Sequence, residues 1–285
     1  MDEYRTKAYA KINLGLDVVK RLPNGYHQVK MIMQNIGIYD ELTFEKAEHD
    51  ITIRTDSEEL PTDKNNLIYK AANYMFCKYA VTSGLRVRLI KNIPIAAGLA
   101  GGSTDAAATI KSINVLFGLG LSIEEMMADG AAVGADVPYC ILGGTALAEG
   151  IGEKLTPLPP IPACRILIAK PDAGVSTKYV YEHLDLTVLN RHPDIDGMTA
   201  AIRGGDLAGI TGRMENVLET VTIPAHPVIA DIKEQMLRLG AENSLMSGSG
   251  PTVFGVFRNP ESAESAYRAL ADSGSAIQVF LTAAV

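Results

Sequence analysis

The sequence predicts an α+β protein built from two domains. Segments with alternating apolar residues, typical of strands, are interspersed with segments whose apolar residues recur every three or four positions, typical of helices. The length of 285 residues suits one large domain or two modest ones. Four prolines fall within the seven residues of Thr156–Pro162, which makes this segment the best candidate for a boundary. We therefore expect one domain over residues 1–156 and a second over residues 163–285.

The composition excludes several classes of protein. Apolar residues make up 47% of the chain and charged residues 21%, an ordinary globular profile. The formal net charge of -7 argues against a general binder of nucleic acid or of anionic membranes. No apolar run is long enough to span a bilayer, and Met1–Arg5 lacks the build of a signal peptide. Cys77, Cys140 and Cys164 show no metal-ligand spacing, so we expect reduced, buried thiols in a cytoplasmic protein.

The first predicted strand, Thr6–Val18, has an apolar face and a polar face. Lys11 and Asn13 both project from the polar face, about 7 Å apart along the strand. Such a face is most often solvated. The turn at 22–25 then leads into Tyr26 and His27. An aromatic face stacks well on a pyrimidine base, and an imidazole can read the polar edge of that base.

The elements up to residue 149 follow from alternation and capping signals. A helix is expected from a cap at Asp63 to about Tyr79, and another from the capping box at 122–125 to near Gly134. Short alternating runs predict strands at Glu41–Lys46, Ile51–Thr55, Leu85–Ile90 and Thr145–Glu149.

A glycine loop lies between the strand at 85–90 and an amphipathic helix. Gly98, Gly101 and Gly102 can take positive φ and admit a ligand close to the backbone, and the stretch 103–105 offers N-cap chemistry. A glycine loop feeding a helix N-terminus suits a phosphate, although a tight turn is the simpler interpretation of any such loop. It is neither a Walker A sequence nor a Gly-x-Gly-x-x-Gly loop. Its candidate phosphate-binding residues are Pro94, Ala97, Gly98, Leu99, Ala100, Gly101, Gly102, Ser103 and Thr104.

Two further loops carry candidate chemistry. Asp136 precedes Pro138 in a short loop, where an Asx turn or a helix cap would equally explain an aspartate. Gly248 and Gly250 permit a tight loop that a ligand can approach closely, or a plain turn between strands. Around them we expect strands at 165–170, 253–257 and 276–282, and helices opening at 175–181, over 228–239 and over 260–271. The stretch 188–213 gives little signal.

Three of these motifs, taken in order, resemble those of the GHMP kinase superfamily of small-molecule kinases. They are Ala10–Leu14, the glycine loop that starts at Pro94, and Met246–Thr252. Gly25-Tyr26-His27 and Gly134–Pro138 are similar to segments of members that phosphorylate a cytidine diphosphate sugar-alcohol in non-mevalonate isoprenoid precursor synthesis. The resemblance implies the two-domain GHMP kinase fold, with an N-terminal domain of the ribosomal-S5-domain-2 type and a ferredoxin-like C-terminal domain.

The resemblance also implies roles for individual residues. Asp136 would be the catalytic base and Lys11 its cationic partner, with ATP phosphates on the glycine loop. The substrate would be bound by Asn13, Tyr26, His27, Asp136 and Tyr181, with Tyr179 as the alternative second wall against cytosine. ATP is the expected co-substrate with Mg²⁺ and no prosthetic group, and Ser103 is a candidate ligand that the sequence does not settle. We expect a monomer or weak dimer with no nucleic-acid or membrane partner.

Ala96 and Ala100 depart from the family pattern, because many members carry glycine at both positions. Alanine strongly disfavours positive φ, so we expect the loop to differ locally or to use negative φ there. Three alternatives remain open. They are a kinase of homoserine or mevalonate, a catalytically silent relative that acts as a regulator or binding module, and an RNA-binding protein that uses the S5-like domain.

Overall fold

The chain forms two compact units whose residues interleave along the sequence. The computed structural model describes residues 2–23, 25–189 and 191–285. One unit comprises Met1–Ala10, Ile38–Ile95 and Ala100–Gly143, and the other comprises Lys11–Gly37, Ala96–Leu99 and Gly144–Val285. This division comes from contacts. The predicted domains over 1–156 and 163–285 stay a prediction.

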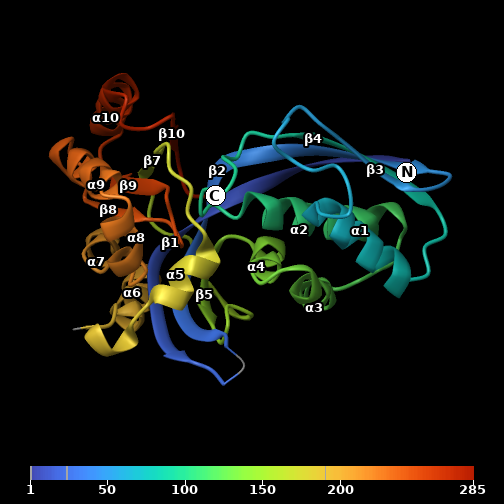
Figure 1. Cartoon of the computed structure of the whole chain (residues 1–285), viewed down its shortest axis with the longest axis horizontal. Helices are drawn as coiled ribbons and strands as arrows, with labels where there is room; N and C mark the ends of the chain where they lie inside the picture. Colours follow the sequence, from blue (N-terminus) through green and yellow to red (C-terminus); the bar gives the residue numbers. More distant parts are fainter. Residues whose placement is uncertain (1, 24, 190) are drawn as a thin grey trace. The chain divides into compact units, whose positions relative to one another are not determined.

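Two long strands supply residues to both units. Strand β1 covers Glu3–Arg21 and pairs with β2, which covers His27–Ala47 (Figure 1). Every residue of the central stretch Ala10–Val18 is buried, so the strand is covered on both faces. In the turn predicted between these strands, Asn24 lies outside the described residues. Gly25 has φ +86° and donates its N–H to Leu22 O at 3.0 Å, as a tight turn requires.

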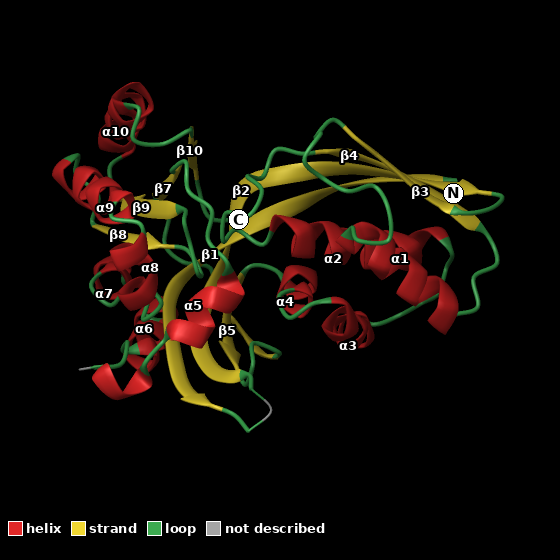
Figure 2. Ribbon diagram, in the orientation of Figure 1, coloured by secondary structure: helices red, strands yellow, loops and turns green. Residues whose placement is uncertain are grey.

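The first unit carries helices on one face of its strands. Strand β4 (Gly84–Ile90) pairs antiparallel with residues 41–47 of β2 and parallel with β3 (Ile51–Thr55). The helices, which Figure 2 shows on one side of these strands, are α1 (Leu67–Lys78), α2 (Gly101–Leu116), α3 (Ile123–Val133) and α4 (Val137–Leu142). The predicted capping box is confirmed, since the Ser122 hydroxyl accepts from Glu125 N and the Glu125 carboxylate accepts from Ser122 N.

The cap predicted for α1 is wrong by three residues. Asn66 has the extended backbone of an N-cap, and its Oδ1 accepts from Ile68 N at 2.8 Å. The predicted cap, Asp63, instead accepts from Asn65 N at 2.9 Å in a local turn just before the helix. Both side chains are good caps, and the choice depends on which residue leaves the helical region.

The second unit contains two sets of antiparallel strands. Met31–Gln34 of β2 pair with β5 (Thr145–Glu149), which pairs with β6 (Lys154–Leu158). A separate four-stranded sheet has the order β10 (Gln278–Thr282), β7 (Arg165–Lys170), β9 (Val253–Phe257) and β8 (Asn243–Met246). Helix α9 packs on β8 and β9, and α10 packs on β7 and β10. The helical segments are α5 (Thr177–His183), the 3₁₀ turn Leu186–Val188, α6 (Ile195–Arg203), α7 (Leu207–Thr211), α8 (Glu219–Ala225), α9 (Val228–Arg238) and α10 (Pro260–Ser273).

The three cysteines were expected to be reduced and buried. No disulfide joins the three cysteines; Cys140 and Cys164 are buried as predicted, but Cys77 is exposed, so its predicted burial is wrong. Cys77 lies near the end of α1, outside the buried stripe formed by Ile68, Ala71, Ala72 and Met75. Among the described residues, none of the helices combines the length and apolarity that a membrane crossing requires.

Candidate active site

The polar face of β1 is buried rather than solvated. Lys11 is 5% exposed and Asn13 1% exposed. Lys11 Nζ donates to Asn13 Oδ1 at 2.8 Å, and Asn13 Nδ2 lies 3.3 Å from Met31 Sδ. A buried ammonium ion is costly unless it is bound, so this pair points to a chemical role for the face. The amide oxygen of Asn13 therefore holds the ammonium group of Lys11 in place.

The second unit brings two sequence-distant segments, 98–99 and 247–248, to this lysine. Lys11 N donates to Leu99 O at 3.1 Å, and Ser247 Oγ donates to Gly98 O at 3.0 Å. A Cβ added to Gly98 would lie 2.3 Å from Ser247 O, and Gly98 has φ +73°. A Cβ on Gly248 would lie 3.5 Å from Asn13 Oδ1 and 3.7 Å from Lys11 Nζ. Gly98 thus permits a backbone approach that a Cβ would block, whereas Gly248 is favoured by its positive φ of +59°.

Side chains that the sequence did not single out hold the loop at 246–250. Asn216, which is 3% exposed, donates from Nδ2 to Met246 O at 2.9 Å and to Gly248 O at 2.8 Å. Ser249 Oγ lies 2.8 Å from Thr177 Oγ1, at the start of α5. Asn216 sits in no motif, because its role depends on long-range pairing of residues 215–217 with Leu16 of β1.

The glycine loop corrects two sequence-based expectations. Ala96 has φ +52° and Ala100 φ +57°, so of the two expected alternatives the negative φ is wrong at both positions. Ala100 is the N-cap of α2 and has a left-handed backbone without any side-chain cap bond. The expected caps at 103–105 are wrong as well, since these residues are already helical; Thr104 Oγ1 donates instead to Tyr9 O at 2.9 Å.

The consequence is a helix start that lacks a side-chain acceptor. The first N–H groups of a helix have no partner within the helix, and here no cap side chain binds them. Together with the positive end of the helix dipole, such N–H groups suit a phosphate. The N–H groups of Gly101, Gly102 and Ser103 at this helix start therefore suit a phosphate group. Pro94 and Leu99, on either side of the turn, are buried.

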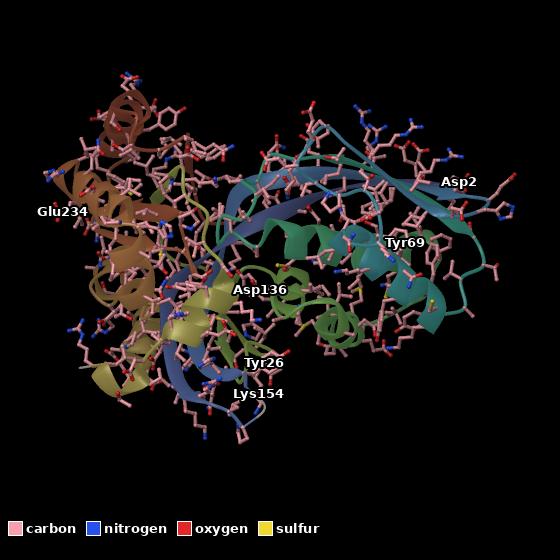
Figure 3. All side chains as sticks on the ribbon, viewed as in Figure 1. Asp2, Tyr26, Tyr69, Asp136, Lys154 and Glu234 are labelled. Carbon is pink, nitrogen blue, oxygen red and sulfur yellow. The ribbon has the colours of Figure 1, made fainter. Side chains whose placement is uncertain are left out.

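Asp136 lies in the first unit at the start of α4 (Figure 3). It is the N-cap residue by position, but its carboxylate makes no cap hydrogen bond, and Pro138 follows in the first turn. The carboxylate is thus not used to begin the helix, which removes the simplest structural explanation for an aspartate here. Lys11 belongs to the other unit, so the expected pairing of Lys11 with Asp136 stays a prediction.

The second unit also forms an aromatic site. The ring centroids of His27 and Tyr181 lie 5.3 Å apart, and the angle between the ring planes is 37°. Tyr26, labelled in Figure 3 beside the turn before β2, is 59% exposed. Burial, and then the charge of Arg21, lowers the pKa of His27 below its usual value, which favours the neutral ring with one donor and one acceptor. Tyr179 instead stacks on His183 of the same helix, with 3.8 Å between the ring centroids.

One titratable pair on the face of Lys11 was not anticipated. Asp17 is 6% exposed, and its Oδ1 lies 2.8 Å from Nδ1 of His192. The strand period places Asp17 on that face, but nothing in the sequence indicates its partner. No cluster of three or more His, Cys, Asp or Glu side chains able to hold a metal occurs among the described residues.

Two family models match the chain. The model described as GHMP kinases N terminal domain matches residues 66–144, and the one described as GHMP kinases C terminal matches residues 198–276. Together they include the glycine loop, Asp136 and the loop at 246–250.

Curated relatives match over almost the whole chain. The 4-diphosphocytidyl-2-C-methyl-D-erythritol kinase of Lachnospira eligens is 53% identical over 283 residues, covering 99% of this chain and 98% of that protein. The enzyme of the same name from Lachnoclostridium phytofermentans is 52% identical and covers 99% of this chain and 97% of its own length.

Solved structures agree with these sequence matches. A crystal structure of 4-(cytidine 5'-diphospho)-2C-methyl-D-erythritol kinase superimposes with a TM-score of 0.85 and 29% identity, covering 99% of both chains. Homoserine kinase from Cytophaga hutchinsonii superimposes with a TM-score of 0.81 at 20% identity, covering 100% of this chain and 95% of its own. At that identity the second likeness concerns the fold alone.

Proposed function

The chain belongs to the GHMP kinase family, and on that premise we propose that it transfers the γ-phosphoryl group of ATP to the 2-hydroxyl of 4-diphosphocytidyl-2-C-methyl-D-erythritol. The products are the 2-phosphate and ADP, in non-mevalonate isoprenoid precursor synthesis. The mixed α/β, two-domain GHMP kinase fold supplies the scaffold. The observation that carries the proposal is the convergence of Lys11, Gly98 and Gly248 in the unit that also holds the aromatic pair His27–Tyr181.

ATP is the phosphoryl donor, as it is for kinases of this family. We place its phosphates on Gly98, Leu99, Gly101, Gly102 and Ser103, because the start of α2 offers N–H donors without a side-chain cap. When bound, Mg²⁺ supplies charge neutralisation at the phosphate oxygens, which are its usual ligands in kinase sites. The flanking residues Pro94, Ala97, Ala100 and Thr104 shape the same loop, and Ser103 is the candidate protein ligand for the ion.

The cytosine base is the part of the substrate that sets specificity. We propose that Tyr26 and Tyr181 stack on its two faces and that His27 reads its polar edge. The lowered pKa of His27 supports this, because a neutral imidazole offers one donor and one acceptor to a base edge. Tyr181 is the better second wall than Tyr179, since Tyr181 lies against His27 whereas Tyr179 stacks on His183.

Asp136 and Lys11 carry the chemical step in this proposal. The carboxylate of Asp136 accepts the proton of the acceptor hydroxyl as its oxygen bonds to the γ-phosphorus. The bond from the γ-phosphorus to the bridging oxygen breaks, and ADP leaves with that oxygen. Lys11, held by Asn13, stabilises the negative charge on the transferring group. The domain limits 1–156 and 163–285, a cytoplasmic location, a monomer or weak dimer, and the lack of nucleic-acid or membrane partners are further proposals that rest on the sequence.

The decisive experiment is ADP release by the purified protein with Mg-ATP and three alcohols offered separately. We expect turnover with 4-diphosphocytidyl-2-C-methyl-D-erythritol and none with homoserine or mevalonate. Asp136→Asn should lower kcat by about 10²–10⁴-fold, the range of a general base. The matched control Asp172→Asn changes an exposed aspartate outside the proposed site and should leave kcat unchanged.

Each other outcome removes a specific part of the proposal. Turnover of homoserine or mevalonate alone would keep a GHMP kinase but discard the cytosine site. ATP binding without turnover of any alcohol would favour a catalytically silent relative. Near-normal kcat in Asp136→Asn would remove that residue from the role of base.

A further inference from the structure

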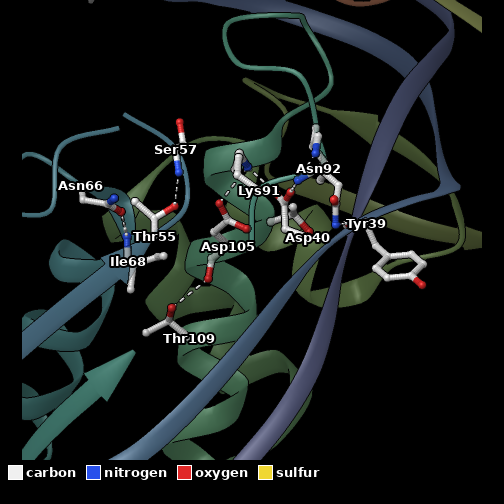
Figure 4. Close-up of polar contacts among 12 residues, drawn as sticks. Tyr39, Asp40, Thr55, Ser57, Asn66, Ile68, Lys91, Asn92, Asp105 and Thr109 are labelled. Atoms are coloured by element: carbon white, nitrogen blue, oxygen red, sulfur yellow. Dashed lines mark hydrogen bonds and ion pairs between the residues drawn. The ribbon is translucent and has the colours of Figure 1, made fainter. Parts of the chain in front are cut away.

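A buried cluster of three charged side chains lies in the first unit, and none of its members belongs to the site described above. Lys91 follows β4, Asp40 is on β2 and Asp105 is on α2 (Figure 4). Their side chains are 5%, 0% and 4% exposed. Lys91 Nζ is paired with Asp40 Oδ2 and lies 3.0 Å from Asp105 Oδ2. One ammonium group therefore joins a strand to the helix that follows the glycine loop.

Asp40 also organises the chain that leads into the loop. Its Oδ1 accepts from Asn92 N at 2.7 Å and from Ile93 N at 2.8 Å. The same carboxylate thus binds the side chain of Lys91 and two successive backbone N–H groups just before Pro94. Hydrogen bonds to a charged acceptor are the strong ones, so this segment is held firmly against β2.

Lys91 contacts the N-terminal part of α2 at two places. A Cβ added to Gly101 would lie 2.9 Å from Lys91 Nζ and 3.1 Å from Ile93 Cγ2, so the ammonium fills the space directly beside Gly101. One turn further on, Lys91 binds Asp105 Oδ2. The other oxygen, Oδ1, is buried and has no hydrogen-bond partner among the described residues. Lys91 is thus what ties this carboxylate, and with it the first turn of α2, to β2.

We propose that Lys91 is a positioning residue for ATP, which fixes Gly101 and the first turn of α2 where their N–H groups meet the phosphates. The inference rests on the proposed function, since it assumes that ATP phosphates bind at this helix start. Lys91 acts through the backbone, because its ammonium is enclosed by two carboxylates. Catalysis by phosphoryl transfer depends on such positioning, and a shift of about 1 Å in a positioning element costs on the order of 10²-fold.

Lys91→Met tests the proposal by removing the charge while keeping the length of the side chain. We expect the KM for Mg-ATP to rise about 10–100-fold, while the KM for the cytidyl alcohol stays within about twofold of wild type. The matched control is Lys78→Met. It removes the cation bound to Asp129, another fully buried carboxylate of the same unit, between α1 and α3. The control should lower the thermal midpoint and leave the KM for ATP unchanged.

A double variant separates positioning from stability. Lys91→Met/Asp105→Asn removes the ammonium together with the carboxylate that depends on it, while Asp40 keeps its two backbone donors. We expect its thermal midpoint to recover toward wild type and its KM for ATP to stay raised.

Three results would overturn the proposal. They are a KM for ATP in Lys91→Met within about twofold of wild type, an equal rise in Lys78→Met, and recovery of ATP affinity together with stability in the double variant. ATP binding measured by calorimetry without an acceptor keeps this test apart from the proposed function. If wild type binds ATP but phosphorylates no cytidyl alcohol, the proposed function fails, and the comparison of ATP affinities still decides the role of Lys91.

Discussion

Two alanines in the glycine loop hold backbone angles that L-residues avoid. Ala96 has φ +52° and Ala100 φ +57°. For an alanine this region costs about 1–2 kcal/mol per residue relative to the right-handed one. The loop keeps this conformation because Gly98 lies between them at φ +73° against Ser247 O, and because Leu99 O binds Lys11 N. Backbone strain of this kind persists where surrounding contacts determine the conformation.

Ala100→Gly should stabilise the protein by about 0.5–1 kcal/mol. The relief of about 1–2 kcal/mol of strain exceeds the roughly 0.4–1 kcal/mol that glycine adds to the entropy of the unfolded chain. Urea unfolding without ligand measures the effect. Ala269→Gly is the control, because Ala269 is exposed in the middle of α10, where glycine should destabilise by about 0.5–1 kcal/mol. If both variants lose stability alike, Ala100 is not strained.

A second prediction for a single residue concerns Asp105 in the buried cluster at Lys91. Two carboxylates face one ammonium there, so full ionisation would leave a buried net negative charge. Burial raises the pKa of Asp105 to about 8, and the charge of Asp40 adds to that rise, whereas the charge of Lys91 opposes it. The folded chain therefore holds a proton on Asp105 between pH 3.8, its ordinary pKa, and about pH 8, whereas the unfolded chain releases it.

Asp105→Asn should therefore gain stability relative to wild type as the pH rises. The stabilisation linked to this proton is complete below pH 3.8 and is lost as the pH rises to about 8. The difference in unfolding free energy should favour the variant by up to about 1.4 kcal/mol per pH unit across this window and then stay constant. Urea unfolding at several pH values from about 5 to 9 measures it.

Asp194→Asn is the control for that series. Hydrogen bonds from Gly197 N and Arg213 lower the pKa of Asp194, so its linked stability is lost only as the pH falls below the ordinary value of 3.8. The difference in unfolding free energy between Asp194→Asn and wild type should stay constant over the same pH values. A flat difference for Asp105→Asn would mean that Asp105 is ionised in the folded protein.

Elements with a local signal were predicted closely from the sequence, and elements without one were not. The strands at 51–55, 165–170 and 253–257 occur as predicted because alternation and flanking turn residues are local properties. Helices α6 and α7, over 195–203 and 207–211, were not predicted, because they contain only 9 and 5 residues. Their periodic signal is too short to stand out from the glycines and charges around them.

One prediction concerns a single element, helix α5. Tyr181→Leu should raise the KM for the cytidyl alcohol by about 5–150-fold, which corresponds to about 1–3 kcal/mol for one lost stack. Tyr179→Leu should change this KM little, because Tyr179 stacks on His183 and takes no part in the ring pair of His27 and Tyr181. Steady-state kinetics with saturating Mg-ATP measures both. The reverse order of effects would identify Tyr179 as the wall.

At the scale of the whole molecule, long-range pairing decides what the sequence conceals. The motif residues could be predicted because the strand period and the glycine spacing are properties of the linear sequence. The division of the chain into its two compact units cannot be found in this way, because strands β1 and β2 each supply residues to both units. Asn216 escaped notice for the same reason, since its place beside β1 arises only from the pairing of residues 215–217 with Leu16. Contacts of this kind leave no local pattern.

The charge of the whole chain leads to the last prediction. The protein carries a formal net charge of -7, and both proposed substrates are polyanions. Long-range attraction therefore does not assemble them, and under the proposed function we expect their charge to be compensated locally by the start of α2, by Lys11 and by Mg²⁺. Removing Mg²⁺ with EDTA should lower turnover by about 10²–10³-fold or more, because a bound metal contributes several kcal/mol to transition-state stabilisation.

Adding back Mg²⁺ in excess should restore turnover, whereas NaCl at equal ionic strength should not, since screening cannot replace a coordinated ion. ADP release in the presence of the cytidyl alcohol measures both arms. A titration of Mg²⁺ in Lys11→Met tests whether the lysine and the metal ion act together. If both act on the same phosphates by charge, the variant should need more Mg²⁺ than wild type for half-maximal turnover. Turnover that persists in EDTA would show that the protein's own cations are sufficient, and it would remove Mg²⁺ from the mechanism.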